Sequence, residues 1–242
     1  MIYKDSIIII PARLKSKRLK NKQLQEINGI PLIKRVVEEV KKMNLCDFIV
    51  ATDSKKIKSC IEGENVIITN KKLNSGSDRC FDALQKIKNK KYKYIVDLQS
   101  DMLNIDKKII DDILINLHNK NIDIITAVYK TKDEKQKQQQ QSVKVAINYN
   151  KSDVIHKCLY FSRSNIPFSN KTAYIHIGIY GYSVKSLIKF ANLEQSNLEK
   201  TEKLEQLRAL ENNMSIYTII TNKKPISIDT KDDLYYAEKF IK

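Results

Sequence analysis

Four consecutive isoleucines at positions 7–10 constrain the fold more than any other stretch of the sequence. A β-branched and wholly apolar run this short predicts a strand buried on both faces, as in a parallel sheet. Pro11 follows directly, and because proline has no N–H to donate to a ladder, we expect the strand to end there. Such a strand delivers the next loop to the carboxyl edge of its sheet, where α/β proteins bind ligands.

The loop that follows the isoleucines is strongly cationic. Its six basic residues are Arg13, Lys15, Lys17, Arg18, Lys20 and Lys22. It lacks the glycines of a Walker motif, but guanidinium forks and a lysine point charge can still neutralise phosphates. The alternative is a solvated basic loop in a lysine-rich chain, and charge alone favours that alternative.

Apolar strands and amphipathic helices alternate through the first half of the chain. Strands are predicted at 6–10, 48–51, 66–68, 94–98 and 122–128. Helices are predicted between them at 32–43, 55–61 and 107–118, and the loop at 74–79 is expected to cap a further helix that ends at residue 87. This alternation predicts an α/β fold with a mainly parallel, doubly wound sheet.

The pattern changes in the second half, which is richer in predicted strands. Residues 130–142 are charged and include four consecutive glutamines at 138–141, so we expect an exposed loop or flexible insertion. Strands are expected at 143–149, 155–161, 172–182 and 215–220. Helices are expected at 185–190 and 198–212, with a last helix after Asp229.

Composition narrows the class of partner. Lys and Arg number 44 against 28 Asp and Glu, a formal net charge of +16, which suggests an anionic partner. The lysines are dispersed and no zinc-finger spacing or aromatic RNA-binding strand is present, so we expect no nucleic-acid partner. No apolar run has the length of a membrane span and the first ten residues lack a signal-peptide pattern. We therefore expect a cytoplasmic protein without a membrane partner, whose four cysteines are reduced thiols.

Two aspartates follow predicted strands at positions suited to a metal. Asp101 comes just after the strand at 94–98, and Asp229 stands at a second strand-to-helix junction. Mg²⁺ takes one or two carboxylates together with phosphate oxygens. The alternative for each is a turn or helix cap, and for Asp229 taken alone the cap is favoured.

Several motifs taken in order resemble one family. They are PARLKSKRLKNKQL at 11–24, ATD at 51–53, SGSDR at 75–79, YFSRSNIP at 160–167, HIGIYGY at 176–182 and LEQLRAL at 204–210. In this order and over almost the whole chain, they resemble the CMP-Kdo synthetases, also called 3-deoxy-manno-octulosonate cytidylyltransferases. The last three motifs are far more specific than any single loop.

The resemblance implies a reaction and an architecture. The anomeric hydroxyl of Kdo would attack the α-phosphorus of CTP in an Mg²⁺-dependent step, giving CMP-Kdo and pyrophosphate for lipopolysaccharide-type glycans. The implied fold is a Rossmann-like nucleotidyltransferase with a mixed, mainly parallel central sheet and a smaller β-rich dimerisation subdomain. Within a single domain of 1–242, residues 1–128 would form the nucleotide-binding half. Residues 129–242 would bind the sugar acid and form a homodimer.

The resemblance also implies roles for individual residues. Nucleotide binding falls to Pro11, Ala12, Arg13, Arg18, Lys22, Ser75, Gly76 and Arg79, with Arg13, Lys22 and Asp101 as the catalytic set. Sugar binding falls to Gln99, Arg163, His176, Tyr180, Glu205 and Gln206. The Mg²⁺ ligands would be Asp101 and Asp229.

Two departures from the family pattern bear on function. The family's QGDEP reads QSDML at 99–103, which keeps Asp101 but adds a side chain at Ser100. The family's LPGK reads LKNK at 19–22, and Asn21 tolerates a left-handed backbone better than most residues. Two alternatives follow. The chain could act on another acid sugar, such as an amino-Kdo or a nonulosonic acid, or it could be a catalytically impaired nucleotide-binding relative.

Overall fold

The computed structural model describes residues 1–16, 18–63, 65–88 and 91–241. Lys17 lies outside the described residues. The chain divides into two compact units, one made of Met1–Lys107 with Pro225–Lys242 and the other of Lys108–Lys224. The boundary between the units thus differs from the expected division into halves at residue 128. Residues 108–128 belong to unit 2, and residues 225–242 belong to unit 1.

Unit 1 contains a parallel four-stranded sheet. Its strands are β1 (Ser6–Ala12), β4 (Asp47–Thr52), β5 (Val66–Ile68) and β6 (Tyr94–Leu98), in the spatial order β5-β4-β1-β6. Counted along the chain this order is 3-2-1-4, as in one half of a Rossmann fold. All seven residues of β1 are buried, so the prediction of a strand covered on both faces is confirmed.

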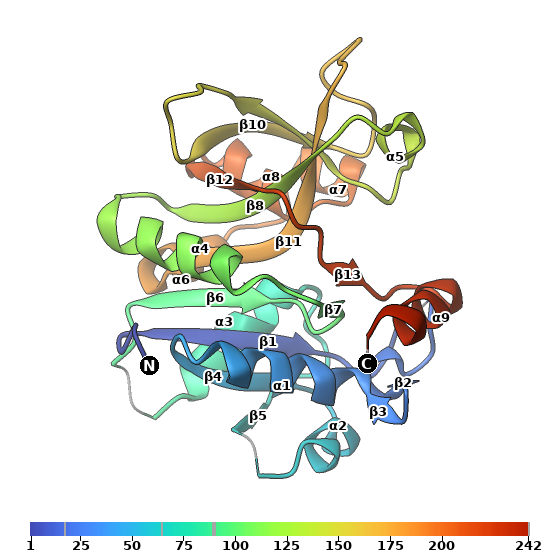
Figure 1. Ribbon diagram of the computed structural model, residues 1–242. Coiled ribbons are helices and arrows are strands. Elements are labelled where there is room, and N and C mark those ends of the chain that lie inside the picture. The colour runs from blue at the N-terminus through green and yellow to red at the C-terminus, as the bar shows by residue number, and fades with distance from the viewer. Residues whose placement is uncertain (17, 64, 89–90, 242) are drawn as a thin grey trace. The chain divides into compact units, whose positions relative to one another are not determined.

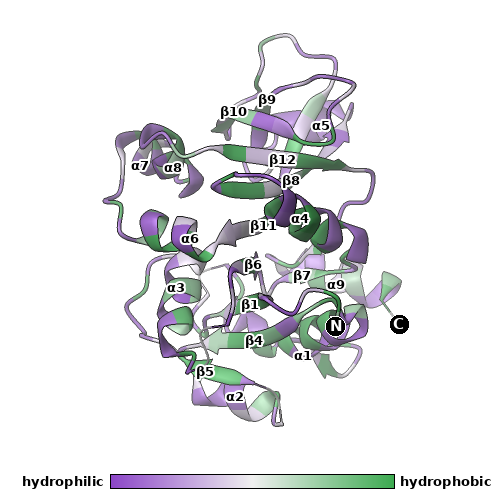
Figure 2. Ribbon diagram, turned by 90° about the vertical axis from the view of Figure 1, so that its left-hand side faces the viewer, coloured by the Kyte–Doolittle hydropathy of each residue, from purple (hydrophilic) through white to green (hydrophobic). Residues whose placement is uncertain are grey.

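Helices cover both faces of this sheet. They are α1 (Leu32–Met43), α2 (Lys55–Cys60) and α3 (Gly76–Lys86), and α1 and α3 lie on opposite sides of β1 and β4 (Figures 1 and 2). In α1, Leu32, Val36 and Val40 form part of the buried face. The predicted α/β alternation is therefore confirmed in this unit.

The prediction that Pro11 ends the first strand is wrong. Pro11 pairs with Ala51 of β4, and β1 continues to Ala12. On its other edge β1 pairs with β6 only as far as Ile9, so the missing N–H of Pro11 interrupts no ladder there. The Pro11 carbonyl accepts a hydrogen bond from Ser100 Oγ at 2.7 Å.

Small elements complete unit 1. The strands β2 (Glu26–Ile27) and β3 (Ile30–Pro31) form a hairpin, and η1 (Lys22–Leu24) is a short 3-10 helix. The strands β7 (Met102–Leu103) and β13 (Ile226–Ser227) pair antiparallel, and α9 (Lys231–Phe240) follows β13. The second pair joins segments more than a hundred residues apart.

Unit 2 has a mixed sheet in the order β11-β8-β12-β10-β9. Its strands are β8 (Ile124–Thr131), β9 (Lys144–Asn148), β10 (His156–Ser162), β11 (Ala173–Ser183) and β12 (Ile216–Thr221). Only β8 and β12 are parallel among the pairs described in this unit. Hydrophobic residues run along β8 and β12 (Figure 2).

Helices α4 (Lys107–Asn119) and α6 (Val184–Ala191) accompany this sheet. A Cβ at Gly181 of β11 would lie 2.5 Å from Ile113 of α4 and 2.8 Å from Ile125 of β8. The second glycine of the HIGIYGY motif therefore allows the helix to approach the sheet closely.

Two predictions about the second half are wrong. Residues 130–142 are not a loop throughout, because β8 extends to Thr131 and α5 (Glu134–Gln138) follows. The predicted helix at 198–212 is two helices, α7 (Asn197–Glu202) and α8 (Gln206–Glu211). They are separated where Lys203 adopts a left-handed backbone with φ of 56°. Among the described residues, no helix is both long enough and apolar enough to span a membrane.

Candidate active site

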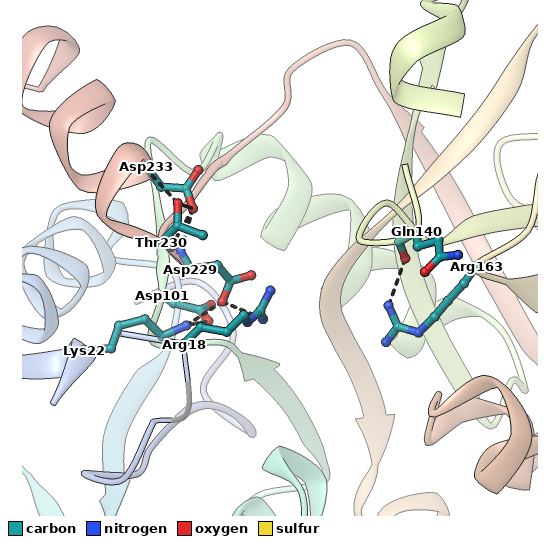
Figure 3. A network of polar contacts seen from close by, with 8 residues as sticks. All are labelled: Arg18, Lys22, Asp101, Gln140, Arg163, Asp229, Thr230 and Asp233. Atoms are coloured by element: carbon teal, nitrogen blue, oxygen red, sulfur yellow. Dashed lines mark hydrogen bonds and ion pairs between the residues drawn. The ribbon is translucent and has the colours of Figure 1, made fainter. Parts of the chain in front are cut away.

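Four charged side chains of unit 1 meet in what we call the Lys22 cluster: Arg18, Lys22, Asp101 and Asp229 (Figure 3). The Lys22 Nζ lies 2.6 Å from Asp101 Oδ2 and 2.9 Å from Asp229 Oδ1. The Arg18 guanidinium lies 2.9 Å from the same Asp229 oxygen. Two predicted metal ligands and two predicted phosphate ligands are thus brought together.

The β7–β13 ladder explains why two distant aspartates converge. Met102 pairs with Ser227 and Leu103 with Ile226. Met102 directly follows Asp101, and Ser227 lies two residues before Asp229. The Asp101 carbonyl also accepts a hydrogen bond from the Ile228 N–H at 2.9 Å. Backbone pairing therefore fixes the two carboxylates relative to each other.

Asn21, which replaces the family's glycine in the cationic loop, directly precedes Lys22. Asn21 has φ of 53° and forms the N-cap of η1 in the left-handed region, as its side chain tolerates. The Lys22 side chain is 10% exposed. Burial lowers the pKa of Lys22, but Asp101 and Asp229 raise it by more, so its net pKa is raised and the amine is charged.

Asp229 does not act as the cap of α9. The cap is Thr230, whose hydroxyl accepts from the Asp233 N–H, while the Asp233 carboxylate accepts from the Thr230 N–H at 2.8 Å. This capping box leaves the Asp229 carboxylate to face Lys22 and Arg18 (Figure 3). The alternative that was favoured for Asp229 taken alone is therefore wrong.

The Lys22 cluster suits a cation that is shared with a ligand. Within the described ranges, no group of three or more His, Cys, Asp or Glu side chains is placed to hold a metal. Asp101 and Asp229 bring two carboxylates to one positive charge. One or two carboxylates are the protein ligands that Mg²⁺ usually takes when phosphate oxygens supply further ligands. The chemistry of the donors thus fits Mg²⁺ bound together with a phosphate.

Three further cations of the loop lie at the surface. Arg13, Lys15 and Lys20 are exposed, and Arg13 makes no hydrogen bond or ion pair to the described part of the chain. Pro11 and Ala12 are buried at the end of β1. Arg13 is therefore available to an anion from solvent.

The SGSDR segment forms the start of α3. Ser75 is the N-cap, and its hydroxyl accepts from the Asp78 N–H at 3.0 Å. A Cβ at Gly76 would lie 2.7 Å from the Gln99 Nε2, so this glycine lets the helix start lie against Gln99. Gln99 in turn donates to Asp97 Oδ1 at 2.9 Å. Ser75, Gly76 and Gln99 therefore gather in unit 1, although Gln99 was predicted to bind the sugar.

Arg79 is a buried structural link. Its side chain is 3% exposed, lies 3.7 Å from Asp53 Oδ2 and donates to Thr69 Oγ1. Asp53 accepts from the Leu14 N–H at 3.0 Å, which ties the ATD segment to the cationic loop. Arg79 thus supports the loop through Asp53.

Ser100, the main departure from the family pattern, is hydrogen-bonded to the backbone of β1. It is 4% exposed, and its hydroxyl donates to the Pro11 carbonyl. The added side chain therefore fills a junction between β1 and the end of β6.

Arg163 of unit 2 is held by backbone carbonyls. Its guanidinium donates to the carbonyls of Glu202, Lys203 and Gln140 (Figure 3 shows the last). The Glu202 carboxylate accepts from the Arg163 N–H at 2.9 Å and from Ser162 Oγ at 2.6 Å. These contacts join the YFSR motif to the end of α7.

His176 and Tyr180 lie side by side at a bulge in β11. The register with β8 shifts between Ile177 and Tyr180, and the ring centroids of His176 and Tyr180 are 5.2 Å apart. Thr126 Oγ1 donates to the Ile179 carbonyl at 2.8 Å, so it accepts from His176 Nε2 at 3.0 Å. Burial lowers the pKa of His176 to about 3, which makes this imidazole neutral.

Glu205 and Gln206 stand at the start of α8. Gln206 is 3% exposed, and its Nε2 has no hydrogen-bond partner within the described residues. Buried amide donors are normally satisfied, so this nitrogen is suited to an acceptor on a ligand. Among the predicted sugar residues, it carries the most specific signal of a binding role.

Sequence reasoning missed Glu39 of α1. Its carboxylate accepts from the backbone N–H groups of Asn104 and Ile105 at 2.9 and 3.2 Å, just beyond β7. Burial is the main cause that raises the pKa of Glu39. No local pattern marks it, because a glutamate in the middle of an amphipathic helix normally faces solvent.

With the fold and these contacts in view, the chain can be placed among known proteins. Residues 7–216 match the model of the family described as Cytidylyltransferase. The chain belongs to this cytidylyltransferase family.

Curated relatives agree over almost the whole length. A 3-deoxy-manno-octulosonate cytidylyltransferase of Rickettsia canadensis is 43% identical over 243 residues, covering 99% of this chain and 97% of the relative. The enzyme of the same name from Rickettsia prowazekii is also 43% identical, with 98% and 96% covered. The resemblance seen in the motifs is therefore confirmed.

Solved structures confirm the nucleotidyltransferase fold. A CMP:2-keto-3-deoxy-manno-octonic acid synthetase complexed with CTP matches with a TM-score of 0.89 at 27% identity, covering 98% of each chain. HddC from Yersinia pseudotuberculosis complexed with GMP-PN matches with a TM-score of 0.67 at 17% identity, covering 98% of this chain and 99% of HddC. The second likeness concerns the fold alone.

Proposed function

We propose that the chain transfers CMP from CTP to the anomeric hydroxyl of Kdo, giving CMP-Kdo and pyrophosphate for lipopolysaccharide-type glycans. The hydroxyl oxygen forms a bond to the α-phosphorus, and the bond from that phosphorus to the β-phosphate oxygen breaks. The observation that carries the proposal is the convergence of Asp101 and Asp229 on Lys22 in a cytidylyltransferase.

Unit 1 would bind the nucleotide and a metal. Arg13, Arg18 and Lys22 would neutralise the triphosphate, with Ser75 and Gly76 at the cytidine and Arg79 acting through Asp53. Asp101 and Asp229 would hold Mg²⁺, which when bound neutralises charge that develops on the phosphate oxygens. Fixed positive charges that meet this developing charge lower the barrier.

Unit 2 would bind most of the sugar acid. The buried Gln206 Nε2 has no hydrogen-bond partner among the described residues and could donate to the sugar. The neutral His176 ring lies beside the Tyr180 ring and would contact the sugar without adding charge. Glu205 would take part at the same helix start. Because Arg163 is engaged by three carbonyls, its role would be to shape this side rather than to pair with the sugar carboxylate. Gln99, which lies in unit 1, would keep the sugar-binding role that the resemblance implies.

The alternatives differ in the sugar or in the loss of catalysis. A buried Ser100 that donates to Pro11 leaves the Lys22 cluster intact, which favours an active enzyme over an impaired relative. Amino-Kdo or a nonulosonic acid could replace Kdo with the same chemistry. We further propose a homodimer and a cytoplasmic location, as the family resemblance implies.

A panel of acid sugars tests the substrate. Pyrophosphate release is measured with CTP and Mg²⁺ and with Kdo, amino-Kdo or a nonulosonic acid, with UTP in place of CTP as the control. We expect the highest kcat/KM with Kdo and CTP. A higher value with another acid sugar would reassign the substrate, and silence with every sugar would support the impaired relative.

A further inference from the structure

The Lys22 amine lies between the two carboxylates that would hold a metal. It contacts Asp101 and Asp229 at 2.6 and 2.9 Å, and its side chain is only 10% exposed. Arg18 adds a second positive group on Asp229. A cation that binds both carboxylates through these same oxygens must therefore displace the Lys22 amine.

The charges of the Lys22 cluster already balance. Two carboxylates face one ammonium and one guanidinium, so the four side chains sum to zero. A divalent cation that entered alone would add two positive charges to a chain with a net charge of +16. A triphosphate carries more negative charge than a divalent cation carries positive charge. When the two enter together, they therefore add net negative charge to the cluster instead of positive charge.

Moving Lys22 is costly unless it gains another anion. A charged amine that leaves its partners while still largely buried loses its compensation. Arg18 is different, because its side chain is 58% exposed and an exposed ion pair contributes little to stability. The phosphates of a nucleotide offer Lys22 a new partner, whereas a metal alone offers none.

We propose that Lys22 occupies the place of the divalent cation in the empty enzyme, so that metal binds Asp101 and Asp229 only together with a triphosphate. The inference rests on the nucleotide and metal roles proposed above. It adds an order to them, because Lys22 leaves the carboxylates when the phosphates arrive and so opens the metal site. The enzyme would therefore not hold free metal between turnovers.

Direct metal binding tests this without turnover. Mn²⁺ is titrated into the full chain and free Mn²⁺ is followed by electron paramagnetic resonance, with and without a non-hydrolysable CTP analogue and without sugar. For the natural sequence we expect Mn²⁺ to bind at least about tenfold more tightly with the analogue, the scale of one charge-assisted contact. Equal affinity with and without the analogue would overturn the inference.

A pair of variants isolates the lysine. Without nucleotide, Lys22→Met should bind Mn²⁺ about tenfold more tightly than the natural sequence, because the carboxylates lose their competing amine. Lys20→Met is the matched control, since Lys20 is exposed on the same loop and its loss changes the net charge equally. An equal gain in both variants would assign the effect to net charge and overturn the inference. If Lys22→Met does not fold, the comparison with and without the analogue decides alone.

The same titrations distinguish a failure of the proposed metal site from a failure of the inference about Lys22. Absence of Mn²⁺ binding even with the nucleotide analogue would overturn the metal roles of Asp101 and Asp229, and the inference with them. Tight Mn²⁺ binding without nucleotide would overturn the inference alone.

Discussion

At the scale of single residues, environment decides what each ionisable group does. Lys22 and Lys20 lie two positions apart in one loop, yet Lys22 is buried against two carboxylates while Lys20 is exposed. Arg163 and Arg13 also differ, since the Arg163 guanidinium donates to three backbone carbonyls while Arg13 is exposed. A residue type at a motif position is therefore a weaker guide than its partners.

His176 makes a prediction about pH. Its pKa falls from 6.5 to about 3 in the folded chain, so the unfolded chain binds the additional proton as pH falls below about 6.5. The stability that neutral His176 contributes is fully present above that pH and is lost as the pH falls toward about 3. Over this range the free energy of unfolding should fall by about 1 kcal/mol per pH unit. Urea unfolding across this range should show a shallower slope for His176→Gln. The same slope in both proteins would contradict a neutral, half-buried His176.

Some of the site was predictable from residue order and some was not. The convergence of Asp101, Asp229 and Lys22 follows from motifs that the sequence displays. The partners of Arg163 could not be predicted, because they are the backbone carbonyls of Gln140, Glu202 and Lys203, which any sequence would offer. Backbone groups leave no signature in residue identity.

At the scale of elements, short ladders matter more to the site than long ones. The β7–β13 pair has two residues in each strand, yet it places Asp101 beside Asp229. Glu39 holds the segment after β7 by accepting two backbone N–H groups. Neither feature was predicted, since strands of two residues carry no periodic pattern.

Glu39 can be tested as a positioning residue. Glu39→Ala leaves two backbone donors without their acceptor, which should lower the free energy of unfolding by about 1–3 kcal/mol. Because those donors follow β7, the affinity for Mn²⁺ with the CTP analogue should also fall, by about fivefold. Glu38→Ala is the matched control, as Glu38 lies on the same helix and its side chain makes no hydrogen bond or ion pair to the described residues. Unchanged metal affinity in a destabilised Glu39→Ala would limit Glu39 to a structural role.

The longer elements show where pattern suffices. The buried isoleucine strand and its neighbours formed as predicted, because hydrophobic burial dictates both their period and their place. The helix predicted at 198–212 is divided because Lys203 adopts a left-handed backbone, a conformation that lysine does not signal. Residues 130–142 are held in place by Lys137 and Lys144, whose amines donate to the carbonyls of Asn170 and Gln139. A charged composition therefore concealed an ordered segment.

At the scale of the whole molecule, the two units divide the proposed work. Unit 1 has the parallel sheet, the cationic loop and the Lys22 cluster, and unit 2 has the mixed sheet with His176, Tyr180 and Gln206. The carboxyl ends of β1 and β6 lead directly to residues of the proposed nucleotide site, as expected for this fold class. Agreement with relatives over nearly the full length indicates that both units belong to one enzyme.

The identity of the product tests the central claim most directly. The chain is incubated with CTP, Kdo and Mg²⁺, and the products are followed by phosphorus NMR, with Asp101→Asn as the inactive variant and Asp232→Asn as its control. Asp232 is an exposed aspartate of α9. We predict a phosphodiester between CMP and the sugar in equal amount to pyrophosphate, lost by at least about a thousandfold in Asp101→Asn and kept in Asp232→Asn. Free CMP in place of the phosphodiester, or full activity in Asp101→Asn, would contradict the account.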